Sequence, residues 1–187
     1  TTIITDDSDK GSTPGDQKGL KDMDDFDLTP TNNFVAALWT GYFNGIAKTN
    51  QALKALETAK LDEDLKLRYQ AEVRFFRGYY YFNLVRWFGG VPKVLKVPLD
   101  AYEANNDPVY QTRATPDEIY ALIIEDLTFA KENLLIKGVM PVGRVTKGTA
   151  TAMLAKVYLT RKNWQEAYTL SQEVISSGSY SLLPDYS

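Results

Sequence analysis

The first 32 residues concentrate acidic side chains that could serve hydrogen bonding or cation binding. Eight aspartates lie in this stretch, at positions 6, 7, 9, 16, 22, 24, 25 and 27. The densest run, residues 22–27, resembles a loop for a hard cation, because calcium takes about six to eight oxygen ligands. The run lacks the glycine and the distal glutamate of an EF-hand loop. We therefore interpret it as a solvated acidic loop and predict no metal site, with calcium as the alternative.

Other side chains that could do chemistry have simpler structural interpretations. Gly138 and Gly143 have the outer spacing of a phosphate-binding loop, but Arg144 follows where lysine and a hydroxyl are needed. We therefore predict no nucleotide or other cofactor, and expect Arg144 to anchor the start of a helix. Arg74 and Arg77 are expected to pair with carboxylates or helix-end carbonyls, as buried arginines usually do.

The amino-acid composition excludes several classes of function. The chain has 187 residues, with 21 basic and 24 acidic side chains and a net charge of −3, so it lacks the basic excess of a nucleic-acid-binding protein. It contains no histidine and no cysteine, which excludes thiol catalysis, disulfides, imidazole acid–base catalysis and most zinc sites. No apolar run approaches the roughly 20 residues needed to span a bilayer. We predict that the protein is not an enzyme.

Hydrophobic periodicity divides the chain into two parts. Residues 1–32 have neither helical nor strand period and are expected to form an irregular surface segment. Residues 33–187 carry apolar side chains at helical spacing and are expected to form a helical domain. The fold is therefore predicted to be all-α, with about five helices.

Five helices are indicated by start and stop signals. The expected spans begin near residues 33, 62, 115, 146 and 163. Thr115, Pro116 and Glu118 give the clearest start, a capping box with proline at the first helical position. Residues 91–114 show no period and are expected to form a loop. The aromatic run at residues 79–82 points all around its helix, so we expect it to pack in the core, with one or two tyrosines at the rim on the surface.

The last two helices match the spacing of a tetratricopeptide repeat. Ala155 and Tyr158 fit the first helix of the motif, and Trp164 and Ala167 fit the second. The alanines would let the two helices cross closely, while Tyr158 and Trp164 would fill the space around the crossing. A second, weaker match lies at residues 75–81. We expect helical hairpins of tetratricopeptide type.

Several segments resemble the SusD/RagB family of outer-membrane nutrient-binding lipoproteins. The longest is residues 71–92, AEVRFFRGYYYFNLVRWFGGVP, which is similar nearly throughout to one helix of that family. Residues 143–148, GRVTKG, and the helix that follows them resemble a second family segment. The opening helix of the family is matched by Trp39, Tyr42, Ile46 and Asn50. The resemblance covers about residues 33–187.

The resemblance implies a tetratricopeptide-like scaffold in the outer membrane that binds a nutrient and works with a SusC-like TonB-dependent transporter. It also implies a lipid anchor on an N-terminal cysteine and exposure at the cell surface. The sequence shows no signal peptide, no lipobox cysteine and no match to the C-terminal half of the family. We therefore expect a fragment of a longer protein, with membrane contact only through an anchor absent from these residues.

The resemblance also suggests where a glycan would bind. Residues 5–7, TDD, resemble an acidic patch that precedes a ligand-contacting loop in family members. The candidate contacts, able to hydrogen-bond sugar hydroxyls or stack on a sugar ring, are Asp6, Asp7, Asp9, Lys10 and Phe26. Starch-binding members place an aromatic residue directly after the patch, where this chain has Ser8. The identity of the glycan is therefore left open, with peptide as another candidate ligand.

The leading hypothesis is non-catalytic binding of an oligosaccharide at the cell surface for delivery to the transporter. The alternative is a tetratricopeptide scaffold that binds a protein or peptide partner, which the repeat spacing alone would support. For the five candidate residues, the alternative is a solvated loop without ligand contact.

Overall fold

The computed structural model of the chain describes residues 2–13 and 15–182. Residues 1, 14 and 183–187 lie outside the described residues, and the last five of these belong to the expected helical domain. The chain forms two compact units, Thr1–Asn44 and Gly45–Ser187. The expected division into residues 1–32 and 33–187 stays a prediction.

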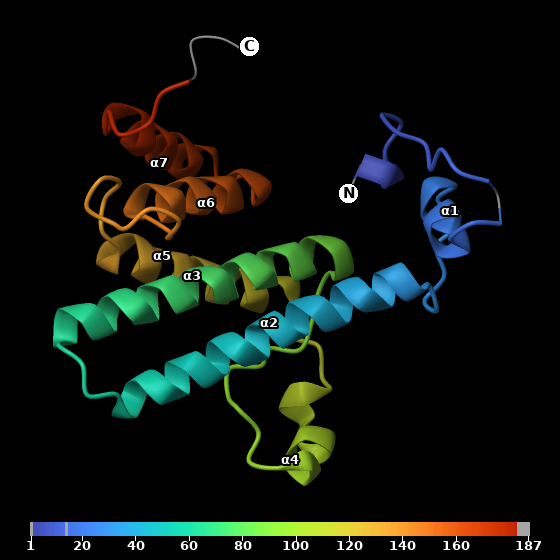
Figure 1. The fold of residues 1–187 in the computed structure, drawn as a ribbon, viewed down its shortest axis with the longest axis horizontal. Coiled ribbons are helices and arrows are strands. Elements are labelled where there is room, and N and C mark those ends of the chain that lie inside the picture. Colours follow the sequence, from blue (N-terminus) through green and yellow to red (C-terminus); the bar gives the residue numbers. More distant parts are fainter. Residues whose placement is uncertain (1, 14, 183–187) are drawn as a thin grey trace. The chain divides into compact units, whose positions relative to one another are not determined.

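Helices dominate both units (Figure 1). They are α1 (Lys18–Asp24), α2 (Asn33–Thr58), α3 (Glu63–Phe88), α4 (Ala101–Asn106), α5 (Pro116–Asn133), α6 (Lys147–Thr160) and α7 (Trp164–Ser176), with short 3-10 helices η1 (Thr2–Ile4) and η2 (Pro108–Tyr110). The all-α prediction is confirmed, since residues 2–13 and 15–182 form isolated bridges but no strand. The five predicted helices correspond to α2, α3, α5, α6 and α7. None of the described helices is long and apolar enough to cross a membrane.

Local signals set the ends of the long helices. The capping box of α5 is confirmed, because the amide of Glu118 donates to the Thr115 hydroxyl and the amide of Thr115 donates to the Glu118 carboxylate. The bond from the Thr115 amide lowers the pKa of Glu118. Thr146 caps α6 by accepting from the amide of Thr149. At the end of α3, Gly89 has a φ of 67°, a left-handed conformation that favours glycine.

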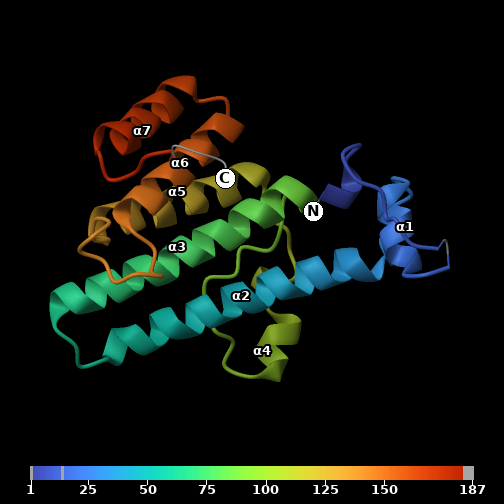
Figure 2. The ribbon, with the colours of Figure 1, turned by 45° about the horizontal axis from the view of Figure 1, so that its top comes forward.

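The second unit is a stack of helices. Helix α3 packs on α5, α5 packs on α6, and α6 packs on α7 (Figures 1 and 2). The side chains at the centre of the stack are at most 1% exposed; they are Tyr81, Phe82, Leu84, Ile119, Ile123, Leu127 and Val157. Tyr81 and Phe82 of the aromatic run at 79–82 lie in the core, as predicted, whereas Tyr79 is 39% exposed at its rim.

The hairpin of α6 and α7 follows the repeat prediction only in part. Ala155 and Ala167 are buried, as expected for a close crossing. Trp164 does not fill the space around that crossing, because 61% of it is exposed. At about 100° per residue, Trp164, Tyr168 and Ile175 share a face of α7 beside the one that carries Ala167. These three exposed residues are called the α7 stripe below.

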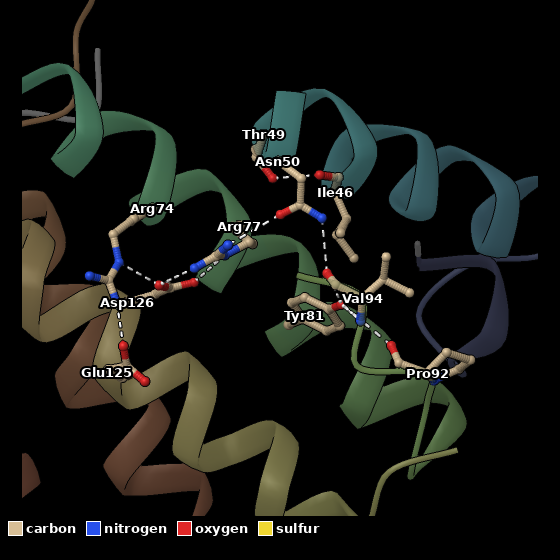
Figure 3. Close-up of polar contacts among 10 residues, drawn as sticks. All are labelled: Ile46, Thr49, Asn50, Arg74, Arg77, Tyr81, Pro92, Val94, Glu125 and Asp126. Atoms are coloured by element: carbon tan, nitrogen blue, oxygen red, sulfur yellow. Dashed lines mark hydrogen bonds and ion pairs between the residues drawn. The ribbon is translucent and has the colours of Figure 1, made fainter. Parts of the chain in front are cut away.

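A buried carboxylate holds α3 to α5. Asp126 of α5 is fully buried and accepts hydrogen bonds from two arginines of α3 (Figure 3). Arg77 places Nε and Nη2 at 2.7 and 2.8 Å from its two oxygens, and Arg74 places Nε at 2.7 Å. Arg74 also reaches the exposed Glu125 at 2.6 Å. The predicted pairing of these arginines with carboxylates is confirmed.

The network continues from Arg77 to α2 and to the chain that follows α3 (Figure 3). Arg77 Nη1 donates to Asn50 Oδ1 at 3.1 Å, and Asn50 Nδ2 donates to the Val94 carbonyl at 3.0 Å. The Tyr81 hydroxyl accepts from the Val94 amide at 2.8 Å. Burial raises the pKa of Tyr81, so the hydroxyl stays neutral and can also donate. One connected set of polar groups therefore positions α2, α3, α5 and Val94.

A second ion pair joins α3 to the loop before α6. Arg144 Nε lies 2.8 Å and Nη2 lies 2.7 Å from Oε2 of Glu72. The guanidinium group also lies over the ring of Tyr69, 5.3 Å from its centroid. Arg144 thus anchors the start of α6, as predicted, and its partner is a carboxylate of α3.

Replacing Asp126 with alanine is expected to lower the free energy of unfolding by about 3–5 kcal/mol, because Arg77 would stay buried without its counter-charge. Urea denaturation followed by circular dichroism measures this loss. Glu125→Ala is the matched control, since Glu125 also pairs with Arg74 but is exposed, and its loss should cost less than about 1 kcal/mol. Equal destabilisation by the two variants would contradict the role assigned to Asp126.

Replacing either of two glycines with alanine should change the stability of the protein, in opposite directions at the two positions. A Cβ at Gly90 would lie 2.2 Å from the carbonyl oxygen of Ala114, so Gly90→Ala is expected to lower stability by about 1–3 kcal/mol. A Cβ at Gly41 would meet no described atom within 4 Å, and Gly41→Ala is expected to raise stability by about 1 kcal/mol through helix propensity. Thermal denaturation of both variants checks the signs, and a shift in the same direction for both would refute this account.

Candidate ligand-binding site

Asn32 organises the first unit. Its side chain is 5% exposed, and Nδ2 donates to the carbonyl of Gly19 in α1 at 2.9 Å. Oδ1 accepts from the amides of Phe34 and Val35 at 3.0 and 3.3 Å. These amides lie in the first turn of α2, where backbone donors lack intrahelical partners. Asn32 therefore caps α2 and fixes α1 beside its start.

A polar hollow of about 410 Å³ lies between α1 and the chain that leads into α2. We call it the α1 hollow; it is lined by Lys18, Gly19, Asp22, Asp27, Thr29, Thr31, Asn32 and Asn33. Carboxylates, hydroxyls, amides and an ammonium group meet there, which gives both donors and acceptors. Such a surface suits a ligand rich in hydroxyl groups better than an apolar one.

The structure places the predicted residues at different points of the first unit. Asp6 and Asp7 are exposed in the turn after η1, where the Asp7 amide donates to the Thr5 hydroxyl at 3.3 Å. The amide of Lys10 donates to the Asp24 carboxylate at 3.4 Å, so Lys10 lies beside the C-terminal end of α1. Phe26 lies two residues after this end of α1. None of these residues lines the α1 hollow, although Phe26 directly precedes Asp27, which does.

Asp9 contributes to the electrostatics of α1. Lys21 of α1 forms an ion pair with Asp25, and this contact raises the pKa of Lys21, with smaller contributions from the charges of Asp24 and Asp9. Asp25 is therefore the ion-pair partner of Lys21, and Asp24 accepts from the Lys10 backbone amide.

Phe26 has the most unusual conformation among the predicted residues. Its φ is 58°, in the left-handed region that a bulky side chain rarely adopts. The residue is 69% exposed, so packing contacts do not offset the strain of its backbone. Strained backbone of this kind concentrates at ligand sites. An exposed aromatic ring can present a flat face to a sugar.

The acidic run at residues 22–27 is a helix end followed by a turn. The amide of Asp27 donates to the Asp22 carbonyl at 2.8 Å, which closes the turn. Among the residues that the structure describes, no group of three or more carboxylates is arranged to hold a metal ion. The geometry offers no support for the calcium alternative.

The sequence does not single out most of the α1 hollow. Lys18, Thr29 and Thr31 have no periodicity or motif that marks them. Asn32 carries a usable signal, since asparagine directly before an apolar helical pattern is a typical N-cap. Asp22 and Asp27 belong to the acidic run, but the turn that brings them to one hollow is not encoded in their spacing.

Comparison with known proteins gives consistent results. A SusD-like family model, described as starch-binding and associating with the outer membrane, matches residues 8–159. A SusD-like protein of Formosa agariphila is 34% identical over 160 residues, 84% of this chain and 30% of the relative. A SusD superfamily structure from Parabacteroides distasonis has a TM-score of 0.80 at 37% identity, covering 91% of this chain and 37% of that one. A laminarin-binding SusD-like structure has a TM-score of 0.77 at 32% identity, covering 88% and 34%.

The chain spans about a third of the length of these relatives. The family match begins at residue 8 and includes Lys10, Phe26 and the whole α1 hollow, whereas Asp6 and Asp7 precede it. The likeness therefore covers most of the candidate site as well as the helices from α2 to α6.

Asn32→Ala is expected to loosen the first unit, because it removes the cap of α2 and leaves the Gly19 carbonyl without its donor. Loss of an N-cap costs about 1 kcal/mol. Hydrogen exchange measured by mass spectrometry should show faster exchange in residues 18–35, with α5 and α6 unchanged. Asn33→Ala, one residue later and without a capping bond, is the control; equal exchange in the two variants would disprove the role of Asn32.

Proposed function

The chain belongs to the SusD-like family, and on this basis we propose that it binds an oligosaccharide at the cell surface. The observation that carries the proposal is the family match over residues 8–159, which includes the α1 hollow. The family is described as starch-binding, and one relative at 32% identity as laminarin-binding. Both descriptions name a polymer of glucose.

The first unit supplies suitable chemistry for this ligand. The ring of Phe26 offers an apolar face, and sugar rings carry C–H bonds on their faces and hydroxyls at their edges. Asp27, the residue after Phe26, lines the α1 hollow, which provides carboxylate, hydroxyl and amide partners for those hydroxyls. Asp6, Asp7, Asp9 and Lys10 extend the polar surface of the same unit. A few placed polar groups beside an apolar face are typical of small-molecule sites.

The proposed binding involves no chemical change in the glycan. Glycoside hydrolysis requires two carboxyl groups flanking the bond, one of them kept protonated by its surroundings. Asp126, the fully buried carboxylate of the core, is instead held by Arg74 and Arg77. Prolonged incubation with the bound glycan should leave its chain length unchanged.

The proposal also includes delivery of the bound glycan to a transporter. The family description includes association with the outer membrane. We place the protein at that membrane, held at the cell surface by a lipid anchor outside residues 1–187. A SusC-like TonB-dependent transporter is the proposed recipient of the glycan.

Binding of a protein partner is a second candidate function, favoured by the α7 stripe. Trp164, Tyr168 and Ile175 are 61%, 61% and 67% exposed along one face of α7. Aromatic residues of this kind are enriched in protein interfaces. Cross-linking of the protein in cells, followed by identification of the peptides joined to α7, distinguishes this function from glycan binding alone.

Phe26→Ala is expected to weaken glycan binding about three- to tenfold, the usual worth of one aromatic contact. The double variant Asp6→Ala with Asp7→Ala is expected to weaken it in the same direction through lost hydrogen bonds. Affinity electrophoresis in gels that contain laminarin or soluble starch measures both effects.

Tyr168→Ala provides the control for Phe26→Ala, because it removes an equally exposed aromatic ring from the second unit. Circular dichroism should show that all variants keep the wild-type fold. Unchanged affinity in both the Phe26 variant and the aspartate variant would place the glycan elsewhere.

A further inference from the structure

Residues 95–112 form a loop that leaves the helical stack between α3 and α5. The loop carries α4 and η2, and α4 lies apart from the stack in both views (Figures 1 and 2). The base of the loop is closed, because Pro92 and Arg113 form an antiparallel bridge and the Ala114 amide donates to the Val91 carbonyl at 3.0 Å. The loop therefore projects from a fixed position.

A charged clamp orders the loop internally. Lys96 Nζ lies 2.5 Å from Glu103 Oε1 and 2.8 Å from Asp107 Oδ2. Glu103 also accepts from the Leu99 amide, and Asp100 caps α4 by accepting from the Glu103 amide. The bond to Asp107, then that to Glu103, raises the pKa of Lys96, and Lys96 lowers the pKa of both carboxyls. The clamp is therefore fully charged throughout the neutral pH range.

The outer side of the loop presents apolar groups that the fold does not use. Leu99 is 84% exposed and Tyr102 is 76% exposed. Asn105 and Asn106 lie three and four residues after Tyr102, the spacing of neighbours on a helix surface. Their amide nitrogens donate to the Ala101 and Tyr102 carbonyls, both at 2.8 Å, which holds the two side chains in place. Both residues are exposed.

We propose that Tyr102, Asn105 and Asn106, which lie in the second unit, form a second oligosaccharide-binding surface. The ring of Tyr102 would stack on one sugar, and the amide oxygens of the two asparagines would accept from hydroxyls at its edge. Because the loop is closed at its base and clamped inside, little conformational entropy is lost on binding. The inference rests on the proposed function for the class of its ligand.

The chemistry of the surface favours a sugar over a protein. One ring flanked by two fixed amides matches the size of a single sugar and its ring of hydroxyls. The α7 stripe shows the contrast, since Trp164, Tyr168 and Ile175 extend along three turns of a helix, as a protein interface would require. Leu99, three residues before Tyr102 and 84% exposed, offers a further apolar group for a neighbouring sugar.

Isothermal titration with a six-glucose oligosaccharide prepared from laminarin, or with the corresponding oligosaccharide of any glycan found on an array, tests the proposal. The wild-type protein should bind two molecules. Tyr102→Ala should lose one of them or weaken it about three- to tenfold, and Phe26→Ala should affect the other. Tyr102→Trp should restore the second molecule, and Tyr168→Ala should bind as the wild type does.

The outcomes separate the two proposals. Wild-type affinity and stoichiometry in Tyr102→Ala, with weakened binding in Phe26→Ala, would overturn the second surface and leave the proposed function standing. Absence of binding to every glycan by the wild-type protein would overturn both. Unchanged glycan binding in Tyr102→Ala together with reduced capture of the transporter would show that this surface contacts protein, which also overturns the inference.

Discussion

The carboxylate of Asp126 is the point at which three helices are held to one another. It is fully buried, and the guanidinium groups of Arg74 and Arg77 satisfy both of its oxygens. Through Arg77 the same charge orients Asn50 of α2, and through Asn50 it reaches Val94. Buried ion pairs repay their desolvation only with good geometry and further hydrogen bonds, and this one has both. Each helix can therefore slide along its neighbour only by breaking a buried polar contact.

Much of the helical stack could be predicted from the sequence, because its long helices carry their own signals. The capping box at Thr115, the glycine after Phe88 and the apolar period give the ends and the inner faces. Arg74 and Arg77 could be assigned a carboxylate partner, but not Asp126 in particular, since 49 or more residues separate them. The short helices α1 and α4 could not be predicted from hydrophobic periodicity, because they complete fewer than two turns and depend on side-chain contacts. The exposure of Trp164 depends on packing that residue spacing does not reveal.

The candidate site was less predictable than the stack. Its position in the N-terminal segment follows from irregular composition, and Phe26 is conspicuous as an aromatic residue among aspartates. The α1 hollow, however, results from Asn32 joining Gly19 to the first turn of α2, a contact between residues 13 positions apart that no sequence pattern marks. The structure of the 95–112 loop was equally unpredictable, because it depends on the ion pairs of one lysine, Lys96, with two carboxylates. In both places charge and hydrogen bonding, rather than apolar pattern, determine the local structure.

The closed base of the 95–112 loop has an evolutionary consequence. The bonds that close it come from residues 91–94 and 113–114 and from Tyr81, all outside the loop itself. Insertions, deletions and substitutions between these points are therefore expected to leave the helical stack intact, since lengthening a surface loop costs little free energy. Descendants of this chain could therefore acquire a new recognition surface by exchanging one loop, while the scaffold and its buried charges are inherited unchanged.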